Sequence, residues 1–172
     1  MPAEIEVLFV VGFGPIVRDV DANLALFRDT LGLAVSAGSE EPDYFATDKL
    51  DGVKNFGMWP LYKAALSCFG QPEWPADLPT PNAWIEFDVA DIEAAARATK
   101  AKGYRLLVET QKEPWGQTVT RFLRPDGVLV GMTLTPSLRS RRGRRVLRAG
   151  IGLESAFHPT SHSEFMGSRS RP

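Results

Sequence analysis

The chain has 172 residues and a formal net charge of −1, and 44% of its residues are hydrophobic, as in a packed protein of one domain or two joined half-domains. No stretch approaches the roughly 20 uninterrupted apolar residues of a membrane helix, and no basic region followed by an apolar run opens the sequence. A single cysteine, Cys68, excludes an internal disulfide and a cysteine-rich metal cluster, and is expected to be a buried apolar residue. We therefore expect a cytoplasmic protein with no membrane partner.

The near-zero net charge hides an asymmetry between the two parts of the chain. Residues 1–136 carry 19 acidic and 12 basic side chains, about −7, whereas residues 137–172 carry 8 arginines and 2 glutamates, about +6, which together give −1. An acidic body repels nucleic acid and favours cationic or neutral small molecules as ligands. The basic segment 137–172 has little apolar periodicity and is predicted to be a flexible, solvated tail.

In chain order, the apolar residues 4–14 predict a buried strand. Asp19 is placed to cap a helix of about three turns that ends near Gly32. Three short strands are then predicted, at residues 33–37, 44–47 and 53–59.

A proline-rich connector, residues 61–81, opens with a short helix-like piece and leads to the most informative strand of the chain. There Ile85 and Phe87 alternate with Trp84, Glu86 and Asp88, so one face of the strand is apolar and the other carries an indole and two carboxylates. This alternation predicts a half-buried strand.

Asp91 is placed to cap a second helix, which ends near Gly103. Strands are predicted at residues 104–109, 118–123 and 128–135, and Pro125-Asp126-Gly127 forms the hairpin turn between the last two.

The two halves repeat one pattern. Val-Arg-Asp-Val-Asp-Ala at residues 17–22 lines up with Val-Ala-Asp-Ile-Glu-Ala at residues 89–94, including the capping aspartate. We therefore predict an α+β fold of two tandem βαβββ modules. The expected boundaries are a first module at 1–60, a connector at 61–81, a second module at 82–136 and a tail at 137–172.

These features resemble the vicinal oxygen chelate superfamily, which includes glyoxalase I, extradiol dioxygenases, fosfomycin-resistance enzymes and bleomycin-resistance binding proteins. The resemblance covers about residues 4–136 and rests on the repeated Val-x-Asp, on Leu31-Gly32-Leu33 and on the Pro-Asp-Gly hairpin. It implies curved mixed sheets around a cleft, helices on the outside, and a homodimer.

Enzymes of that superfamily bind a divalent metal through side chains on the first and last strand of each module. The matching positions in this sequence are Gly12, Trp84, Gly131 and a fourth at or beside Trp59. None of these residues has a side chain that ligates a metal. The resemblance therefore implies a protein without a metal or other cofactor, closest in character to the bleomycin-resistance proteins.

An aromatic slot is expected where the metal would lie. Trp84 and Trp59 supply flat walls that stack on planar rings and attract cations, and Glu86 and Asp88 lie alongside. The complete set of expected ligand-binding residues is Trp84, Trp59, Glu86, Trp115, Phe122, Phe45, Gly12 and Gly131, with the choice between Tyr44 and Phe45 left open by the alternation.

The first functional hypothesis is a metal-free binding protein that sequesters a planar or cationic compound such as an antibiotic. A second is a lyase, isomerase or dioxygenase of the same superfamily that uses other ligands, such as Glu86 with Glu109 and Glu113, to hold a metal. A third is a dimeric interaction module whose tryptophans simply fill the cleft.

Overall fold

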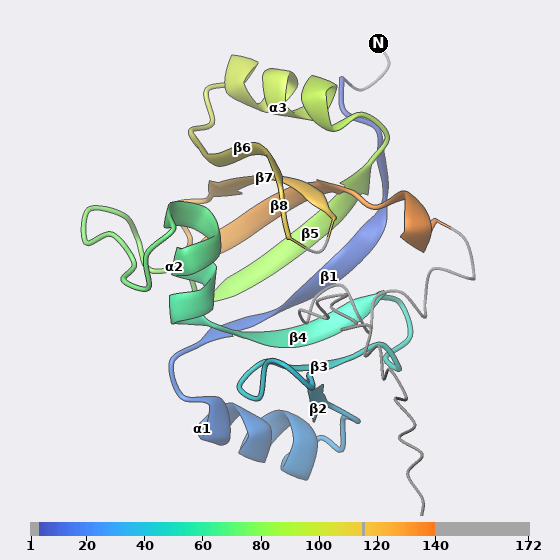
Figure 1. Cartoon of the computed structure of the whole chain (residues 1–172), viewed down its shortest axis with the longest axis vertical. Helices are drawn as coiled ribbons and strands as arrows, with labels where there is room; N and C mark the ends of the chain where they lie inside the picture. Colours follow the sequence, from blue (N-terminus) through green and yellow to red (C-terminus); the bar gives the residue numbers. More distant parts are fainter. Residues whose placement is uncertain (1–3, 115, 140–172) are drawn as a thin grey trace, which may run out of the picture.

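The computed structural model of the chain describes residues 4–114 and 116–139, which form one eight-stranded mixed sheet (Figure 1). The strand order is β2-β3-β4-β1-β5-β8-β7-β6, with β2 and β6 at the two edges. None of the helices within these residues is both long and apolar enough to cross a bilayer. The arginine-rich tail beyond Arg139 and the expected wall residue Trp115 lie outside the described residues.

The first half of the chain supplies the strands on one side of the sheet. Its elements are β1 (Val7–Val17), α1 (Val20–Leu24) continued by a π-helical segment (Ala25–Thr30), β2 (Ser36–Ala37), β3 (Phe45–Thr47) and β4 (Asn55–Pro60). Strand β2 is shorter than expected because the Leu33 N–H donates to the Phe27 carbonyl at 2.9 Å and so still belongs to the end of the helix.

The second half repeats this arrangement after a connecting helix, α2 (Leu61–Phe69). Its elements are β5 (Ala83–Val89), α3 (Ile92–Ala101), β6 (Leu106–Lys112), β7 (Thr118–Leu123), β8 (Val128–Leu134) and a final 3-10 turn (Pro136–Leu138). The two expected caps are confirmed, since Asp19 accepts from the Ala22 N–H and Asp91 from the Ala94 N–H, each at 2.9 Å.

The two halves meet where β1 pairs with β5 in antiparallel orientation. Gly12 pairs with Glu86 and Gly14 with Trp84. The repeat offset of 72 residues maps Gly12 onto Trp84 and Gly14 onto Glu86, so exchanging the halves turns one pair into the other. The pairing is therefore symmetric, and within this chain the two modules join each other through their first strands.

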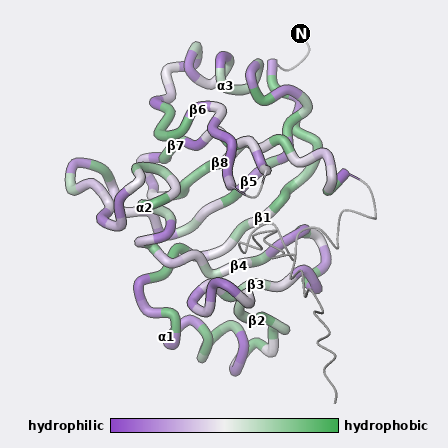
Figure 2. Tube along the Cα trace, viewed as in Figure 1, coloured by the Kyte–Doolittle hydropathy of each residue, from purple (hydrophilic) through white to green (hydrophobic). Residues whose placement is uncertain are grey.

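Helices α1 and α3 cover one face of this sheet, and α2 covers the other. Val17 packs with the α1 side and Val89 with α3, whereas Ile16 and Trp84, which point the opposite way, pack with α2. Along α1 and α3 hydrophobic and hydrophilic residues alternate, as in helices with one buried face (Figure 2).

The burial of β5 is the reverse of what the alternation suggested. Trp84, Glu86 and Asp88 are buried, and Ile85 and Phe87 are only partly buried. Helix α2 covers the face that carries the indole and the carboxylates. On the other face Phe13, from the neighbouring β1, is 39% exposed. The polar side of β5 is therefore the interior of the protein.

Candidate functional site

A cavity of about 300 Å³ lies between α2 and the sheet. Its walls combine aromatic rings with paired charges. The lining residues are Glu41, Tyr44, Trp59, Tyr62, Lys63, Leu66, Ser67, Trp84, Glu86, Glu113, Pro114, Gln117 and Arg121.

The floor of the cavity is set by one row of residues across five strands. One residue of each strand lies in this row. From β4 through β1, β5 and β8 to β7, the residues are Asn55, Gly12, Glu86, Gly131 and Arg121. The two glycines leave room for larger neighbours: a Cβ on Gly131 would lie 2.6 Å from the Glu86 Cγ, and one on Gly12 would lie 2.7 Å from the Trp84 ring. Glu86 can therefore lie across Gly131 and reach Arg121 on β7.

Arg121 joins two buried carboxylates. Its Nη2 donates to the Glu86 Oε1 and its Nη1 to the Glu113 Oε1, each at 3.0 Å. The exposed fractions of the Arg121, Glu86 and Glu113 side chains are 3%, 7% and 4%. These three residues, called here the ion cluster, hold two negative charges and one positive charge away from water.

Two further side chains bind to the ion cluster. Ser67, on α2, accepts from the Arg121 Nη1 at 2.6 Å and donates to the Glu113 Oε1 at 3.0 Å. Gln117 donates from Nε2 to the Glu86 Oε2 at 3.2 Å. Glu86 is therefore held on both oxygens by protein donors, and α2 is tied to the second module.

The charges around Arg121 keep it cationic. Burial lowers its pKa, but the charge of Glu86, with a smaller contribution from Glu113, outweighs burial and raises the pKa above the ordinary guanidinium value. Burial also raises the pKa of the Cys68 thiol to about 11, so this cysteine is the inert core residue expected from the sequence.

Aromatic rings form the opposite side of the cavity. Trp59 and Trp84 meet edge to face with ring centroids 5.7 Å apart, and the Arg121 guanidinium lies 5.2 Å from the Trp59 centroid. The Trp84 Nε1 donates to the Gly57 carbonyl at 3.3 Å, which fixes the ring across the first module. Trp84 is thus both a core residue, 5% exposed, and a cavity wall.

The register corrects one of the positions at which the superfamily binds its metal. Gly12 pairs with Asn55, while its counterpart Trp84 pairs with Leu129, so the counterpart of Gly131 is Gly57, two residues before Trp59. A Cβ on Gly57 would lie 2.4 Å from the Tyr44 hydroxyl. The four positions are three glycines and one indole, and the space above the glycines holds Trp84, Tyr44 and Glu86. The residues present do not fit a metal of the superfamily type.

A second group of charges stands at the rim of the cavity. Tyr62 and Lys63 of α2 contact Asp43 of the loop before β3: the Tyr62 hydroxyl donates to the Asp43 carboxylate, and the Lys63 Nζ lies 2.7 Å from Asp43 and 3.3 Å from Glu41. The bond to Asp43 raises the pKa of Tyr62 to about 12. The pKa of Asp43 is lowered, because Lys63 and Tyr62 outweigh the effect of burial. These four residues, called here the rim cluster, connect α2 to the first module.

The structure brings some of the expected site residues together. Trp59, Trp84 and Glu86 line the cavity. Gly12 and Gly131 lie beneath the Trp84 and Glu86 side chains, so they accommodate these side chains and add no free space. The neighbour of Trp115, Pro114, lines the cavity.

Other expected residues lie elsewhere. Phe45 packs with the α1 core and Phe122 lines a groove beside Tyr104 and Met132 on the face of α3, because each side chain points to the opposite side of its strand. It is Tyr44, and not Phe45, that faces the cavity.

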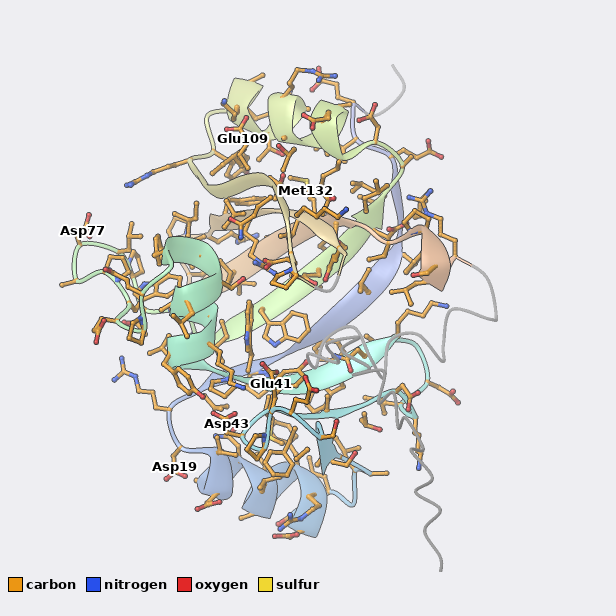
Figure 3. All side chains as sticks on the ribbon, viewed as in Figure 1. Asp19, Glu41, Asp43, Asp77, Glu109 and Met132 are labelled. Carbon is orange, nitrogen blue, oxygen red and sulfur yellow. The ribbon has the colours of Figure 1, made fainter. Side chains whose placement is uncertain are left out.

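Two acidic residues proposed for the slot have other partners. Asp88 accepts from the Thr135 N–H at 2.7 Å and from the Arg139 Nε at 2.7 Å, and so holds the end of the second module. Glu109 is bound to Lys100 of α3 and is half exposed, and Figure 3 shows it far from the cavity residue Glu41.

Sequence reasoning missed Arg121, Gln117 and the side chains of α2. In α2, Tyr62 lies four residues before Leu66, and Lys63 lies four residues before Ser67. This spacing places the two pairs on adjoining faces of a helix. That spacing was a usable signal. Trp74 anchors the connector by donating from its Nε1 to the Pro79 carbonyl at 3.0 Å.

The sequence matches the family model of the glyoxalase/bleomycin resistance protein/dioxygenase superfamily over residues 13–132. No curated protein matches this chain. Among solved structures, a superfamily member from Vibrio splendidus 12B01 is 21% identical, with a TM-score of 0.47 over 73% of this chain and 96% of that one.

Two further solved structures are similar at lower identity. A Streptomyces coelicolor methylmalonyl-CoA epimerase variant is 17% identical, with a TM-score of 0.46 over 76% of this chain and 96% of that one. A Legionella pneumophila protein described as an NAD-dependent benzaldehyde dehydrogenase is 13% identical, with a TM-score of 0.48 over 72% of this chain and 96% of that one. Since the family model spans more than half of the sequence, the chain belongs to the glyoxalase/bleomycin resistance protein/dioxygenase superfamily.

Proposed function

We propose that this chain is a small-molecule binding protein that holds a planar or cationic organic compound in the cavity beneath α2, without metal chemistry. The observation that carries the proposal is the replacement of the superfamily's metal-binding side chains by Gly12, Gly57, Trp84 and Gly131, next to a cavity with aromatic walls. Flat rings bind between such walls by stacking and by exclusion of water.

The charges of the cavity support a ligand that is neutral or positive. Glu41, Glu86 and Glu113 face Lys63 and Arg121 across the lining, which leaves one excess negative charge. A cation on or beside the rings of Trp59 and Trp84 gains from this charge and from the negative faces of the rings.

An enzyme that uses Glu86 as a metal ligand has less support. Both Glu86 oxygens accept hydrogen bonds from protein donors, Arg121 and Gln117, and Glu109 lies on the surface with Lys100. A divalent ion at Glu86 would displace Arg121 or meet its positive charge.

The proposal is tested by titrating the protein with N-methylquinolinium, a planar cation, while following tryptophan fluorescence and heat release. We expect saturable one-to-one quenching that is lost in Trp59→Leu and retained in Trp74→Phe, the matched control in the connector. Unsaturable quenching, or equal quenching in both variants, contradicts the proposal. So does stoichiometric, tightly held metal in protein purified without chelators.

Sequestration of a toxic compound, as in antibiotic resistance, is the role that we propose for this binding. Cells that express the chain should tolerate a bound compound better, and the compound should be recovered with unchanged mass. A changed mass would favour the enzyme hypothesis. The homodimer stays a prediction, which sedimentation equilibrium of the purified chain tests.

A further inference from the structure

Arg121, one of the lining residues of the cavity, has one unused donor on its guanidinium. Its Nη1 and Nη2 are bound to Ser67, Glu113 and Glu86, but within residues 4–114 and 116–139 no atom accepts from the Arg121 Nε, which is buried. A buried donor without a partner loses its hydrogen bonds to water and gains none in return, which costs most in a charged group, so such a group is rare in a native protein. An orphaned donor in the lining of a cavity points to an acceptor that the ligand supplies.

The geometry of the guanidinium defines where that acceptor binds. The Nε–H and one Nη2–H lie on the same edge of the planar group, which usually binds both oxygens of one carboxylate. Here Glu86 binds Nη2 through Oε1 alone, since its Oε2 accepts from Gln117, and Nε has no acceptor among the described residues. One further acceptor atom is therefore needed at the Nε end of this edge.

The surrounding charges decide which kind of acceptor fits. The ion cluster already has one negative charge in excess, so a carboxylate or phosphate on the ligand would meet Glu86 and Glu113 at close range in a water-poor site. A neutral oxygen, such as a ring ketone or amide carbonyl, accepts the bond without adding charge. Because Arg121 lies against Trp59, a carbonyl in the plane of a ring that packs along this wall comes to the guanidinium edge.

We propose that Arg121 is a specificity-determining residue of the cavity, and that its Nε–H selects planar ligands carrying a neutral carbonyl acceptor over equally flat ligands without one. This inference rests on the proposed function, because it names the ligand class of the same cavity. It goes beyond that function by assigning the polar contact that distinguishes one flat compound from another.

The experiment compares four bicyclic probes of similar shape by calorimetry and tryptophan quenching. The probes are quinoline, N-methylquinolinium, 1-methyl-4-quinolone and 4-oxo-1H-quinoline-2-carboxylate. We expect the quinolone to bind about 10-fold more tightly than quinoline, since one hydrogen bond from a charged donor contributes about 1.4 kcal/mol in a buried site, which is a factor of ten. The carboxylate should bind more weakly than the neutral quinolone.

Arg121→Lys is the informative variant, because it keeps the positive charge between Glu86 and Glu113 but removes the donor edge. Its quinolone-to-quinoline ratio should fall to about 1, while binding of N-methylquinolinium changes less than 3-fold. Arg124→Lys, in the exposed hairpin after β7 and outside the cavity lining, is the matched control and should keep the wild-type ratio. If Arg121→Lys does not fold, the four affinities of the wild-type protein still decide the matter.

The outcomes separate the two proposals. If the quinolone and quinoline bind equally to the wild type, or the carboxylate binds best, the role of Arg121 is wrong and the cavity remains a binding site. If none of the four probes binds, the proposed function itself is overturned. A ratio near 10 that Arg121→Lys leaves unchanged also contradicts the assignment to Arg121.

Discussion

The two modules share a backbone pattern but differ in what they place at the centre of the sheet. The first module has Gly12, Gly14, Gly57 and Ala46 at positions where the second has Trp84, Glu86, Gly131 and Arg121. The large side chains of the second module lie across the first: the Trp84 ring covers Gly12 and donates to the Gly57 carbonyl.

This difference shows how a duplicated fold loses the symmetry of its site. A metal bound by both modules needs side chains from both. Here the first module contributes glycines, which leave room, and the second contributes the large and the charged side chains. A single asymmetric cavity therefore replaces a centre shared by both modules. The connecting helix α2 follows the same division, since it meets the first module through the solvent-facing rim cluster and the second through the buried ion cluster.

The largest test of this comparison removes the charge that only the second module has. Arg121→Met leaves Glu86 and Glu113 buried without their cation, and we expect a loss of about 3–5 kcal/mol in the free energy of unfolding. Urea denaturation measures the loss.

The triple variant E86Q/E113Q/R121M removes all three charges and should recover most of the lost stability. A single variant as stable as the wild type would show that the ion cluster is not the buried unit described here. Ala46→Ser, at the uncharged counterpart position in the first module, should cost less than about 1 kcal/mol.

The second test concerns the close approach of β1 and β4. In Gly14→Ala the new Cβ would lie 1.9 Å from the Gly57 carbonyl oxygen, which is backbone and cannot move aside without separating the strands. We expect a loss of about 3 kcal/mol, measured as a lower urea midpoint. Gly38→Ala is the control, because its Cβ would meet Glu41 at an ordinary 3.8 Å, and a similar loss in both variants would contradict the argument.

Much of this framework was predictable from the sequence, because it depends on local patterns. The aspartate caps, the paired helices and the Pro-Asp-Gly hairpin each rest on a few adjacent residues. The repeat then gave the superfamily and the positions of Gly12, Trp84 and Gly131.

The site was less predictable, because alternation along a strand says which residues share a face but not which face is covered. Glu86 is interior because α2 and the segment between β6 and β7 lie over it, whereas Asp88 is covered by Thr135 and Arg139. Arg121 is paired inside the protein because Glu86 reaches it across Gly131. The choice between Tyr44 and Phe45 stayed open for the same reason. The counterpart of Gly131 was placed two residues away because the loop between β3 and β4, residues 48–54, is longer than the turn at residues 124–127 and has no Pro-Asp-Gly to mark the position.

A third test compares glycines whose neighbours are side chains and not backbone. Gly131→Ala pushes on the Glu86 Cγ and Gly12→Ala on the Trp84 ring, and both neighbours can shift. We expect each variant to lose about 1–2 kcal/mol, less than Gly14→Ala.

The two variants should differ in their optical signals. Gly12→Ala should change tryptophan emission, while Gly131→Ala should leave emission unchanged and alter probe affinity through Glu86. Equal emission changes in the two variants would argue against the separate positions assigned to Trp84 and Glu86.

The smallest effect is expected at the rim cluster, the solvent-facing half of the comparison. The pKa of Tyr62 is raised to about 12, so its bond to Asp43 stabilises the fold below the ordinary tyrosine value of about 10 and is lost as the pH rises toward 12. The pKa of Asp43 is lowered, so its contribution is present above the ordinary value of about 3.9 and is lost as the pH falls through the lower folded pKa. The rim cluster should therefore be strongest between about pH 4 and pH 10.

Tyrosine absorbance at 295 nm, taken as wild type minus Tyr62→Phe, isolates this group. The difference curve should titrate near pH 12 and shift toward about 10 in Asp43→Asn, which removes the charged acceptor. Because solvent screens the rim, Tyr62→Phe should cost less than about 1 kcal/mol, in contrast to the ion cluster. A difference curve centred near pH 10 in the wild type would mean that Tyr62 does not hold Asp43 in solution, and α2 would then be fixed to the sheet through Ser67 and the second module, leaving the rim free to open.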